Sequence, residues 1–220
     1  MSQAARPPVE LWRDISRPLS AATRVWPGDR AFTLDQRREG EWTISALTTS
    51  CHVGTHLDTP RHVDPAAPGL EDVPIDRLIG PAEVVHARSG ASLIGRADLP
   101  EDWVPFAARV LIRTDSYPLD VPVDGGFAAL HPELVEFVAG RGVEVIGIDT
   151  PSVDPFDSVD HPCHRALAAH GLVWLENLLL DGVEPGLYVL AALPLALVGA
   201  EAAPVRAVLR PVTPGAGGER

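Results

Sequence analysis

Short apolar runs rich in β-branched residues recur along the chain and predict β-strands. The clearest of these runs are Val84–Ala87, Arg109–Arg113, Val143–Ile148, Leu187–Ala192 and Val205–Leu209. A further segment, Trp42–Thr48, alternates apolar and polar residues, which is typical of a strand with one exposed face. The pattern therefore predicts a strand-rich protein.

Two segments have the pattern of short helices. The stretch His131–Gly140 has a proline at its first turn, an early glutamate and a glycine where a helix would end. His164–Gly171 is the second candidate. Strand, helix and strand follow one another across residues 130–150, as in an α/β unit. We therefore expect a mixed, strand-rich α/β fold that forms one domain over residues 9–211, with flexible segments at 1–8 and 212–220.

Composition narrows the classes of function. The chain has 220 residues, with 18 basic and 30 acidic side chains and a net charge of −12, so binding to nucleic acid or an anionic membrane surface is not expected. The longest uncharged apolar run, Leu187–Ala200, is interrupted by Pro194 and is shorter than the ~20 residues of a membrane span. We interpret it as a buried pair of strands. No secretory signal is visible, so the two cysteines are expected to be free thiols in the cytoplasm.

The candidate chemistry is concentrated in residues 51–62, CHVGTHLDTPRH. In an extended strand, His52 and His56 would lie ~13 Å apart, too far to bind one metal ion. In a regular helix these two histidines would meet, but Asp58 would point away from them. A turn or a distorted first helical turn brings all three together, and Gly54 permits one. The spacing therefore favours a site for one divalent ion, most simply zinc, with manganese or iron possible. A surface loop with scattered histidines is the alternative.

A second candidate region lies downstream, in Asp160-His161-Pro162-Cys163-His164 and at Glu176. Glu176 lies among leucines, where a carboxylate is costly to bury unless it is paired or bound to a metal ion. Taken alone, Glu176 is better explained as a helix cap or a surface residue, and His161, His164 and His170 could be surface histidines. His86 and His131 lack neighbours at ligand spacing and are interpreted as structural.

The segment HVGTHLDTPRH resembles the H-x-G-[TA]-H-x-D-x-P-x-H signature of the metal-dependent cyclase-like hydrolases, a family that includes bacterial kynurenine formamidase and isatin hydrolase. The resemblance extends over most of the chain, for example to LWRDISRPLSAATRVWPGD (residues 11–29) and APVRAVLR (residues 203–210). It implies a swivelling β/β/α fold and an assembly of two or four identical subunits.

The resemblance also implies a role for each candidate residue. The ligands of two divalent metal ions would be His52, His56, Asp58, His164 and Glu176, with Asp58 and Glu176 bridging the ions. His62 would be the catalytic acid/base, and Trp26 would contact an aromatic amide substrate.

The implied reaction is hydrolysis of the amide of N-formyl-L-kynurenine to L-kynurenine and formate in tryptophan degradation. Three alternatives are a sister hydrolase of cyclic amides such as isatin, another hydrolase of the family with the same metal site, and a metal-binding protein without catalytic activity. A serine hydrolase is disfavoured because the chain has no G-x-S-x-G motif.

Overall fold

The computed structural model describes residues 12–119 and 121–212. The terminal segments expected to be flexible, 1–8 and 212–220, lie outside these residues except at residue 212.

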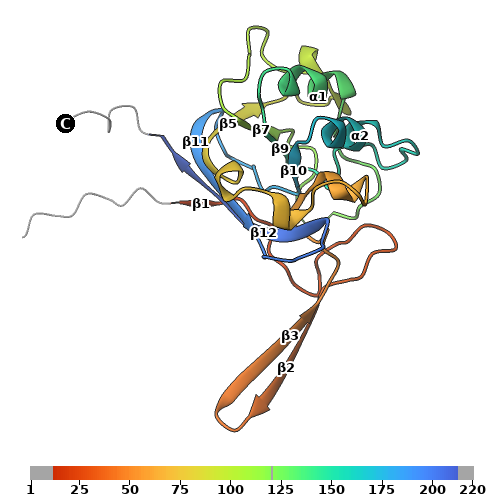
Figure 1. The fold of residues 1–220 in the computed structure, drawn as a ribbon, viewed down its shortest axis with the longest axis vertical. Coiled ribbons are helices and arrows are strands. Elements are labelled where there is room, and N and C mark those ends of the chain that lie inside the picture. Colours follow the sequence, from red (N-terminus) through yellow and green to blue (C-terminus); the bar gives the residue numbers. More distant parts are fainter. Residues whose placement is uncertain (1–11, 120, 213–220) are drawn as a thin grey trace, which may run out of the picture.

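The centre of the molecule is an eight-stranded sheet in the order β1-β12-β11-β5-β7-β9-β10-β4 (Figure 1). Because β12 also pairs with β4, the sheet closes on itself. Neighbours from β5 to β10 are parallel, and the other pairs are antiparallel. The strands are β1 (Arg13–Asp14), β4 (His56–Asp58), β5 (Ile79–His86), β7 (Arg109–Arg113), β9 (Val145–Ile148), β10 (Val173–Glu176), β11 (Gly186–Pro194) and β12 (Ala202–Pro211).

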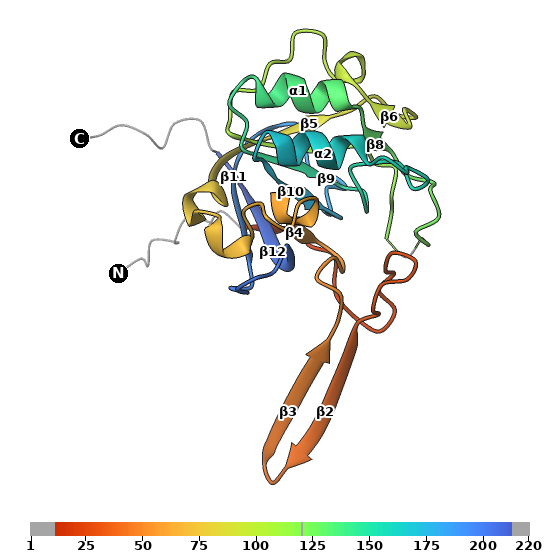
Figure 2. The ribbon, with the colours of Figure 1, turned by 45° about the vertical axis from the view of Figure 1, so that its right-hand side comes forward.

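Two helices, α1 (Pro132–Ala139) and α2 (Pro162–Ala169), lie side by side against one face of the sheet (Figure 2). The alternation of β7 divides its side chains between two cores. Val110 and Ile112 pack in the cluster that includes both helices, whereas Leu111 packs in the cluster on the other face. Burial of each such side chain stabilises the fold by about 1.5–3 kcal/mol. The strand-rich α/β fold predicted from the sequence is confirmed.

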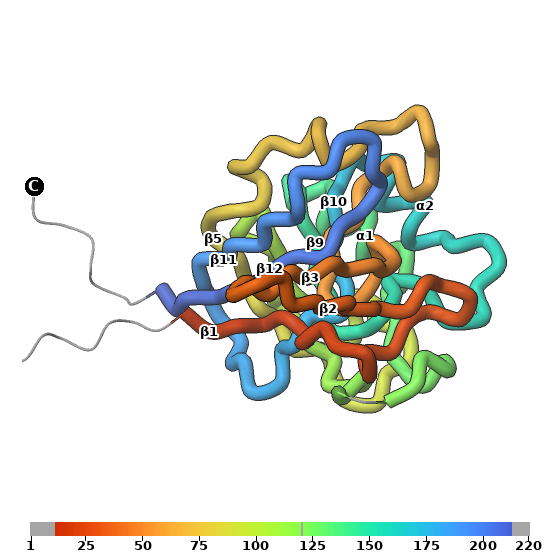
Figure 3. The backbone as a smooth tube through the Cα atoms, turned by 90° about the horizontal axis from the view of Figure 1, so that it is seen from below, coloured from red at the N-terminus to blue at the C-terminus, as the bar shows by residue number. Residues whose placement is uncertain are grey.

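Smaller elements complete the body. Four 3₁₀ turns lie at η1 (Pro60–His62), η2 (Leu70–Asp72), η3 (Ile75–Arg77) and η4 (Arg96–Asp98). β6 (Leu93–Ile94) pairs with β8 (Ala129–Leu130) in a separate two-stranded sheet. Figure 3 shows the body from below, with β1 and β12 adjacent near the two ends of the chain.

A two-stranded arm, formed by β2 (Thr33–Glu39) and β3 (Trp42–Thr48), extends away from the body (Figures 1 and 2). The bounds predicted for β3 are correct, but the expected buried face is wrong. Every residue of both strands is exposed, because within residues 12–119 and 121–212 each strand pairs only with the other and no helix or sheet covers either face.

The interpretation of Leu187–Ala200 as a buried strand pair is also wrong. Its first part forms β11, and the remainder is a loop that leads to β12. Leu195 and Val198 in that loop are exposed. Pro194 ends the strand because proline has no N–H to continue the ladder.

Candidate metal centre and its cavity

A turn before β4 delivers the first group of candidate ligands. His52 lies in this turn, while His56 and Asp58 lie on β4. Gly54 has a φ of 58°, and a Cβ at this position would approach the Leu19 side chain to 2.5 Å. A glycine avoids both the left-handed strain and this clash. The turn expected around Gly54 is therefore present, followed by extended chain and not by a helix.

The register of β4 explains how Glu176 joins this group from more than a hundred residues away. β4 pairs antiparallel with β10, which places Glu176 directly opposite His56. Residues opposite each other project from the same face of a sheet, and so do alternate residues of one strand. His56, Asp58 and Glu176 consequently converge at one point.

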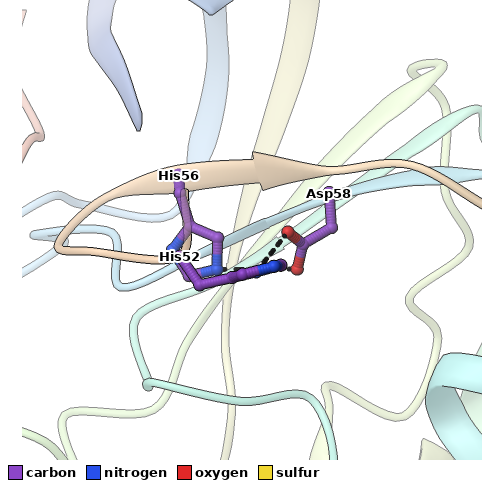
Figure 4. A group of neighbouring side chains, drawn as sticks. All are labelled: His52, His56 and Asp58. Atoms are coloured by element: carbon purple, nitrogen blue, oxygen red, sulfur yellow. Dashed lines mark ion pairs between the residues drawn. The ribbon is translucent and has the colours of Figure 1, made fainter. Parts of the chain in front are cut away.

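The distances show a compact cluster (Figure 4). Nδ1 of His52 lies 3.0 Å from Oδ1 of Asp58, and Nε2 of His56 lies 3.5 Å from Oδ2 of the same carboxylate. Glu176 turns Oε2 toward Nε2 of His56 at 3.4 Å and Oε1 toward Nε2 of His164 at 3.6 Å. The Glu176 carboxylate thus lies between two imidazoles that come from different parts of the chain.

The cluster fits a divalent cation. Ligand atoms of His52, His56 and Asp58 lie within 4.8 Å of one another, and the same holds for Asp58, His62 and His164. Nε2 of His56 and both carboxylate oxygens of Asp58 are buried without a hydrogen bond in the described part of the chain. Such atoms are costly to bury unless a cation or donor satisfies them. Imidazole and carboxylate ligands are those that zinc accepts, and manganese or iron would also suit them.

Electrostatics within the cluster favour charge separation between its members. Burial alone would lower the pKa of His56, but the carboxylates of Asp58 and Glu176 outweigh it and hold that pKa well above its ordinary value. Burial likewise opposes ionisation of Asp58, yet the neighbouring His56 and His52 hold its pKa well below its ordinary value. The cluster therefore keeps Asp58 as a carboxylate, the form that binds a metal ion.

Each of three imidazoles in the cluster has one ring nitrogen beside an oxygen from elsewhere in the chain. These oxygens are the Gly54 carbonyl for Nδ1 of His56 (2.8 Å), the Asp154 carboxylate for Nδ1 of His164 (2.6 Å) and the Glu201 carboxylate for Nε2 of His52 (3.2 Å). A carbonyl or carboxylate oxygen only accepts, so the nitrogen facing it donates. With a metal ion bound, the other nitrogen of each ring would be deprotonated and would present its lone pair to that ion, as a metal ligand requires.

Asp154 also fixes the start of α2. Besides the His164 ring, its carboxylate accepts hydrogen bonds from the backbone N–H of Cys163 (2.9 Å) and of His164 (3.0 Å). Burial opposes ionisation of Asp154, but these donors lower its pKa. A single buried carboxylate therefore caps the helix and orients the ring that the helix carries.

His62 lies at the end of η1, beside the cluster. Its ring centroid is 4.3 Å from that of His52 and 5.5 Å from that of His164. Its pKa is lowered, mainly because the surrounding protein displaces water, and also because the His52 and His164 rings oppose a further positive charge. The lowered pKa favours the neutral imidazole of His62 beside the candidate ligands, and its position suits either a further ligand or a proton carrier.

A cavity of about 400 Å³ opens above the cluster, and five of the eight histidines line it: His52, His56, His62, His161 and His164. Trp26 lines the same cavity and is half-buried. Its ring packs at 5.1 Å from that of Phe156 and 6.4 Å from that of Phe127. The cavity therefore combines an aromatic wall at Trp26 with a polar floor of candidate metal ligands.

Some site residues escaped the sequence reasoning. Asp154 and Glu201 orient ligands, but neither lies at a spacing that links it to a histidine in sequence. Arg24 and Asn177 line the cavity from loops. His161, interpreted from the sequence as a possible surface residue, lines it as well. The other three histidines lie outside the cavity lining. His86 contacts Asp115, His170 contacts Glu136, and His131 accepts a hydrogen bond at the start of α1.

Comparison with known proteins identifies the family of the chain. The family model described as a putative cyclase matches residues 13–155. The chain belongs to the cyclase family. Kynurenine formamidase from Salinibacter ruber is 43% identical over 90% of this chain and 96% of its own length. Kynurenine formamidase from Bordetella pertussis is also 43% identical, over 91% of this chain and 97% of its own length.

Solved structures of other cyclase-like proteins share the fold. A predicted metal-dependent hydrolase from Bacillus stearothermophilus has a TM-score of 0.79 and 25% identity, covering 90% of this chain and 97% of its own. Isatin hydrolase A from Labrenzia aggregata has a TM-score of 0.76 and 22% identity, covering 90% of this chain and 93% of its own.

Among the described residues, no helix is both long and apolar enough to cross a bilayer.

Proposed function

We propose that this cyclase-family enzyme hydrolyses N-formyl-L-kynurenine to L-kynurenine and formate, as an arylformamidase of tryptophan degradation. The observation that carries this proposal is the 43% identity, over about nine-tenths of the chain, to proteins named kynurenine formamidase. The cavity supports it, because an aromatic wall lies beside a cluster of imidazole and carboxylate groups. Isatin hydrolases resemble the chain at 22% identity or less, which is evidence for the fold alone.

The proposed cofactor is a pair of divalent ions, most simply Zn²⁺, with Mn²⁺ as the alternative. His52, His56 and Asp58 would hold one ion and His164 the other, with Asp58 and Glu176 shared between them. The two oxygens of Glu176 support this sharing, since one faces His56 and the other faces His164. When bound, such ions supply Lewis acidity and lower the pKa of a coordinated water to about 7.

His62 is the proposed proton carrier. In the reaction the oxygen of water bonds to the formyl carbon, the carbon–nitrogen bond breaks, and the aniline nitrogen gains a proton. His62 begins as a neutral imidazole, so it can accept a proton from the attacking water and then donate it to the leaving nitrogen. Its lowered pKa makes the imidazolium a stronger acid, which favours the second transfer.

Trp26 is the proposed contact for the substrate ring. Its indole is held by Phe156 and Phe127 and still borders the cavity, so one face can pack against the kynurenine ring. Aromatic pairs of this kind add about 0.5–1.5 kcal/mol beyond the area they bury. Trp26 would therefore act mainly on substrate binding.

The arm formed by β2 and β3 is the proposed contact with a second copy of the chain, which would make the enzyme a homodimer or a dimer of dimers. Trp42 is 74% exposed and Leu47 is 59% exposed, and Leu34 lies opposite Leu47 across the ribbon. An isolated two-stranded ribbon is marginally stable in water, and apolar side chains on it favour a covering partner.

The free thiols of Cys51 and Cys163 support a reducing compartment such as the cytoplasm.

Steady-state rates with N-formyl-L-kynurenine and with isatin, measured on the same preparation before and after chelation, test the proposed function. We expect a higher kcat/KM for N-formyl-L-kynurenine than for isatin, loss of turnover on chelation and recovery with zinc. Preference for isatin would show that the substrate is a cyclic amide. No turnover of either compound by metal-replete protein would favour a metal-binding protein without catalytic activity.

A further inference from the structure

Asn177 has an unusual backbone next to the candidate metal ligands. It directly follows Glu176 at the end of β10, and its φ is 57°, a left-handed conformation that non-glycine residues rarely adopt. Both sides of its backbone are held: its N–H donates to the Thr150 carbonyl (2.8 Å), and its carbonyl accepts from the Thr55 hydroxyl (2.6 Å). Thr55 directly precedes His56. The bond from Thr55 therefore ties Asn177, which follows Glu176, to the segment that carries His56.

The left-handed turn changes where the Asn177 side chain can lie. In a continued strand, residues 176 and 177 would project to opposite faces of the sheet. Here Glu176 and Asn177 both line the same cavity. The turn at residue 177 therefore ends the strand and keeps two consecutive residues on the cavity wall.

The Asn177 carboxamide has no hydrogen-bond partner in the described part of the chain. The residue as a whole is only 9% exposed, and it lines the cavity. Buried carboxamides normally have their donors and acceptor satisfied. A group with one acceptor and two donors, on a residue that lines the cavity next to Glu176 in sequence, is suited to pair with another amide.

We propose that Asn177 binds the scissile amide of the substrate, donating from Nδ2 to the amide carbonyl oxygen as that oxygen gains negative charge during attack. This role rests on the proposed amide hydrolysis and adds a neutral donor to it. A neutral donor suits this position, because a cation there would compete with bound metal ions for Asp58 and Glu176. The competing explanation is that asparagine occupies residue 177 only because it tolerates a positive φ better than most residues.

Asn177→Gly separates the two explanations. Glycine adopts a positive φ freely, so this variant keeps the turn and removes only the carboxamide. We expect an unchanged or raised melting temperature, unchanged metal content, and a kcat lowered by on the order of 10², as for other single donors to a developing oxyanion. Asn177→Asp keeps the shape but replaces the donor with an acceptor, and its kcat should fall at least as far.

The substrate for these variants should include formanilide, which has the scissile amide but no amino-acid group, beside N-formyl-L-kynurenine. The same fold loss in kcat on both compounds supports the proposal. A wild-type kcat in Asn177→Gly, a loss confined to KM of N-formyl-L-kynurenine, or a loss of bound metal would each overturn it. If the wild-type enzyme prefers another amide, the proposed substrate fails while the role of Asn177 is tested on that amide.

Discussion

Replacing Asp154 with asparagine should weaken metal binding although Asp154 is not itself a proposed ligand. Its carboxylate accepts three hydrogen bonds, two from the backbone at the start of α2 and one from the His164 ring, and it is fully buried. Asparagine has one acceptor oxygen. If that oxygen keeps both bonds to His164, its NH₂ group must face the Cys163 N–H, and one buried donor is left unpaired.

The size of the effect follows from that count. One unpaired buried donor costs about 1–3 kcal/mol, which corresponds to a melting temperature lower by about 2–12 °C for a domain of this size. In the variant, Nδ1–H of His164 donates to a neutral amide oxygen and no longer to a carboxylate. The imidazole is then less basic and becomes a weaker metal ligand. Removal of such a supporting carboxylate typically costs 10–100-fold in metal affinity.

Chelator competition on reconstituted Asp154→Asn protein, together with thermal melting, measures both effects. Asp157→Asn is the matched control, since it makes the same change on an exposed residue five positions before α2. Wild-type metal affinity in Asp154→Asn would refute the reasoning, even with a lowered melting temperature. That outcome would mean that His164 does not depend on Asp154 for its orientation, or does not bind a metal ion.

Four further predictions concern residues of the site. His62→Ala should retain its metal ions and its melting temperature while kcat falls by ~10²–10⁴, and metal loss would instead identify His62 as a ligand. Because the pKa of His62 is lowered, wild-type activity should fall only as the pH drops below the ordinary histidine pKa of ~6.5, where the base becomes protonated. Trp26→Ala should raise KM, because the lost apolar contact weakens substrate binding by ~1–3 kcal/mol, and the melting temperature should not change. A strongly lowered melting temperature would instead identify Trp26 as a core residue. Glu201→Gln, beside His52, should weaken metal binding without altering the fold, as metal titration of the apoprotein would show.

Local sequence patterns predicted the strands whose apolar residues are in fact buried. Arg109–Arg113 forms β7 with the expected bounds because both of its faces are buried, one under the helices and one in the other core. Trp42–Thr48 forms a strand, as its alternation of apolar and polar residues predicted, but every residue of it is exposed. Alternation predicts that a strand has two different faces, and it does not predict what covers them. The arm is exposed because, among the described residues, β2 and β3 pair only with each other.

The site shows the same division between local and distant information. The cluster of His52, His56 and Asp58 was visible because it lies within seven residues and needs only a turn. Glu176 could be assigned only from family resemblance, because its approach to His56 depends on the pairing of β4 with β10. Asn177 carried no sequence signal at all, since its position in the cavity depends on a single left-handed residue.

The strand that carries two of the ligands is also the strand that closes the sheet. β4 has only three residues, yet it pairs with β10 on one side and β12 on the other. The carboxylates of Asp58 on β4 and Glu176 on β10 both face Nε2 of His56, and Thr59 is held by the carbonyl of Glu201, which precedes β12. This junction therefore holds two buried carboxylates near one imidazole, and the Asp58 oxygens have no hydrogen bond among the described residues. Metal binding at this point would therefore stabilise the closure of the fold as well as supply the chemistry, since ligands from β4, β10 and α2 would share the same ions.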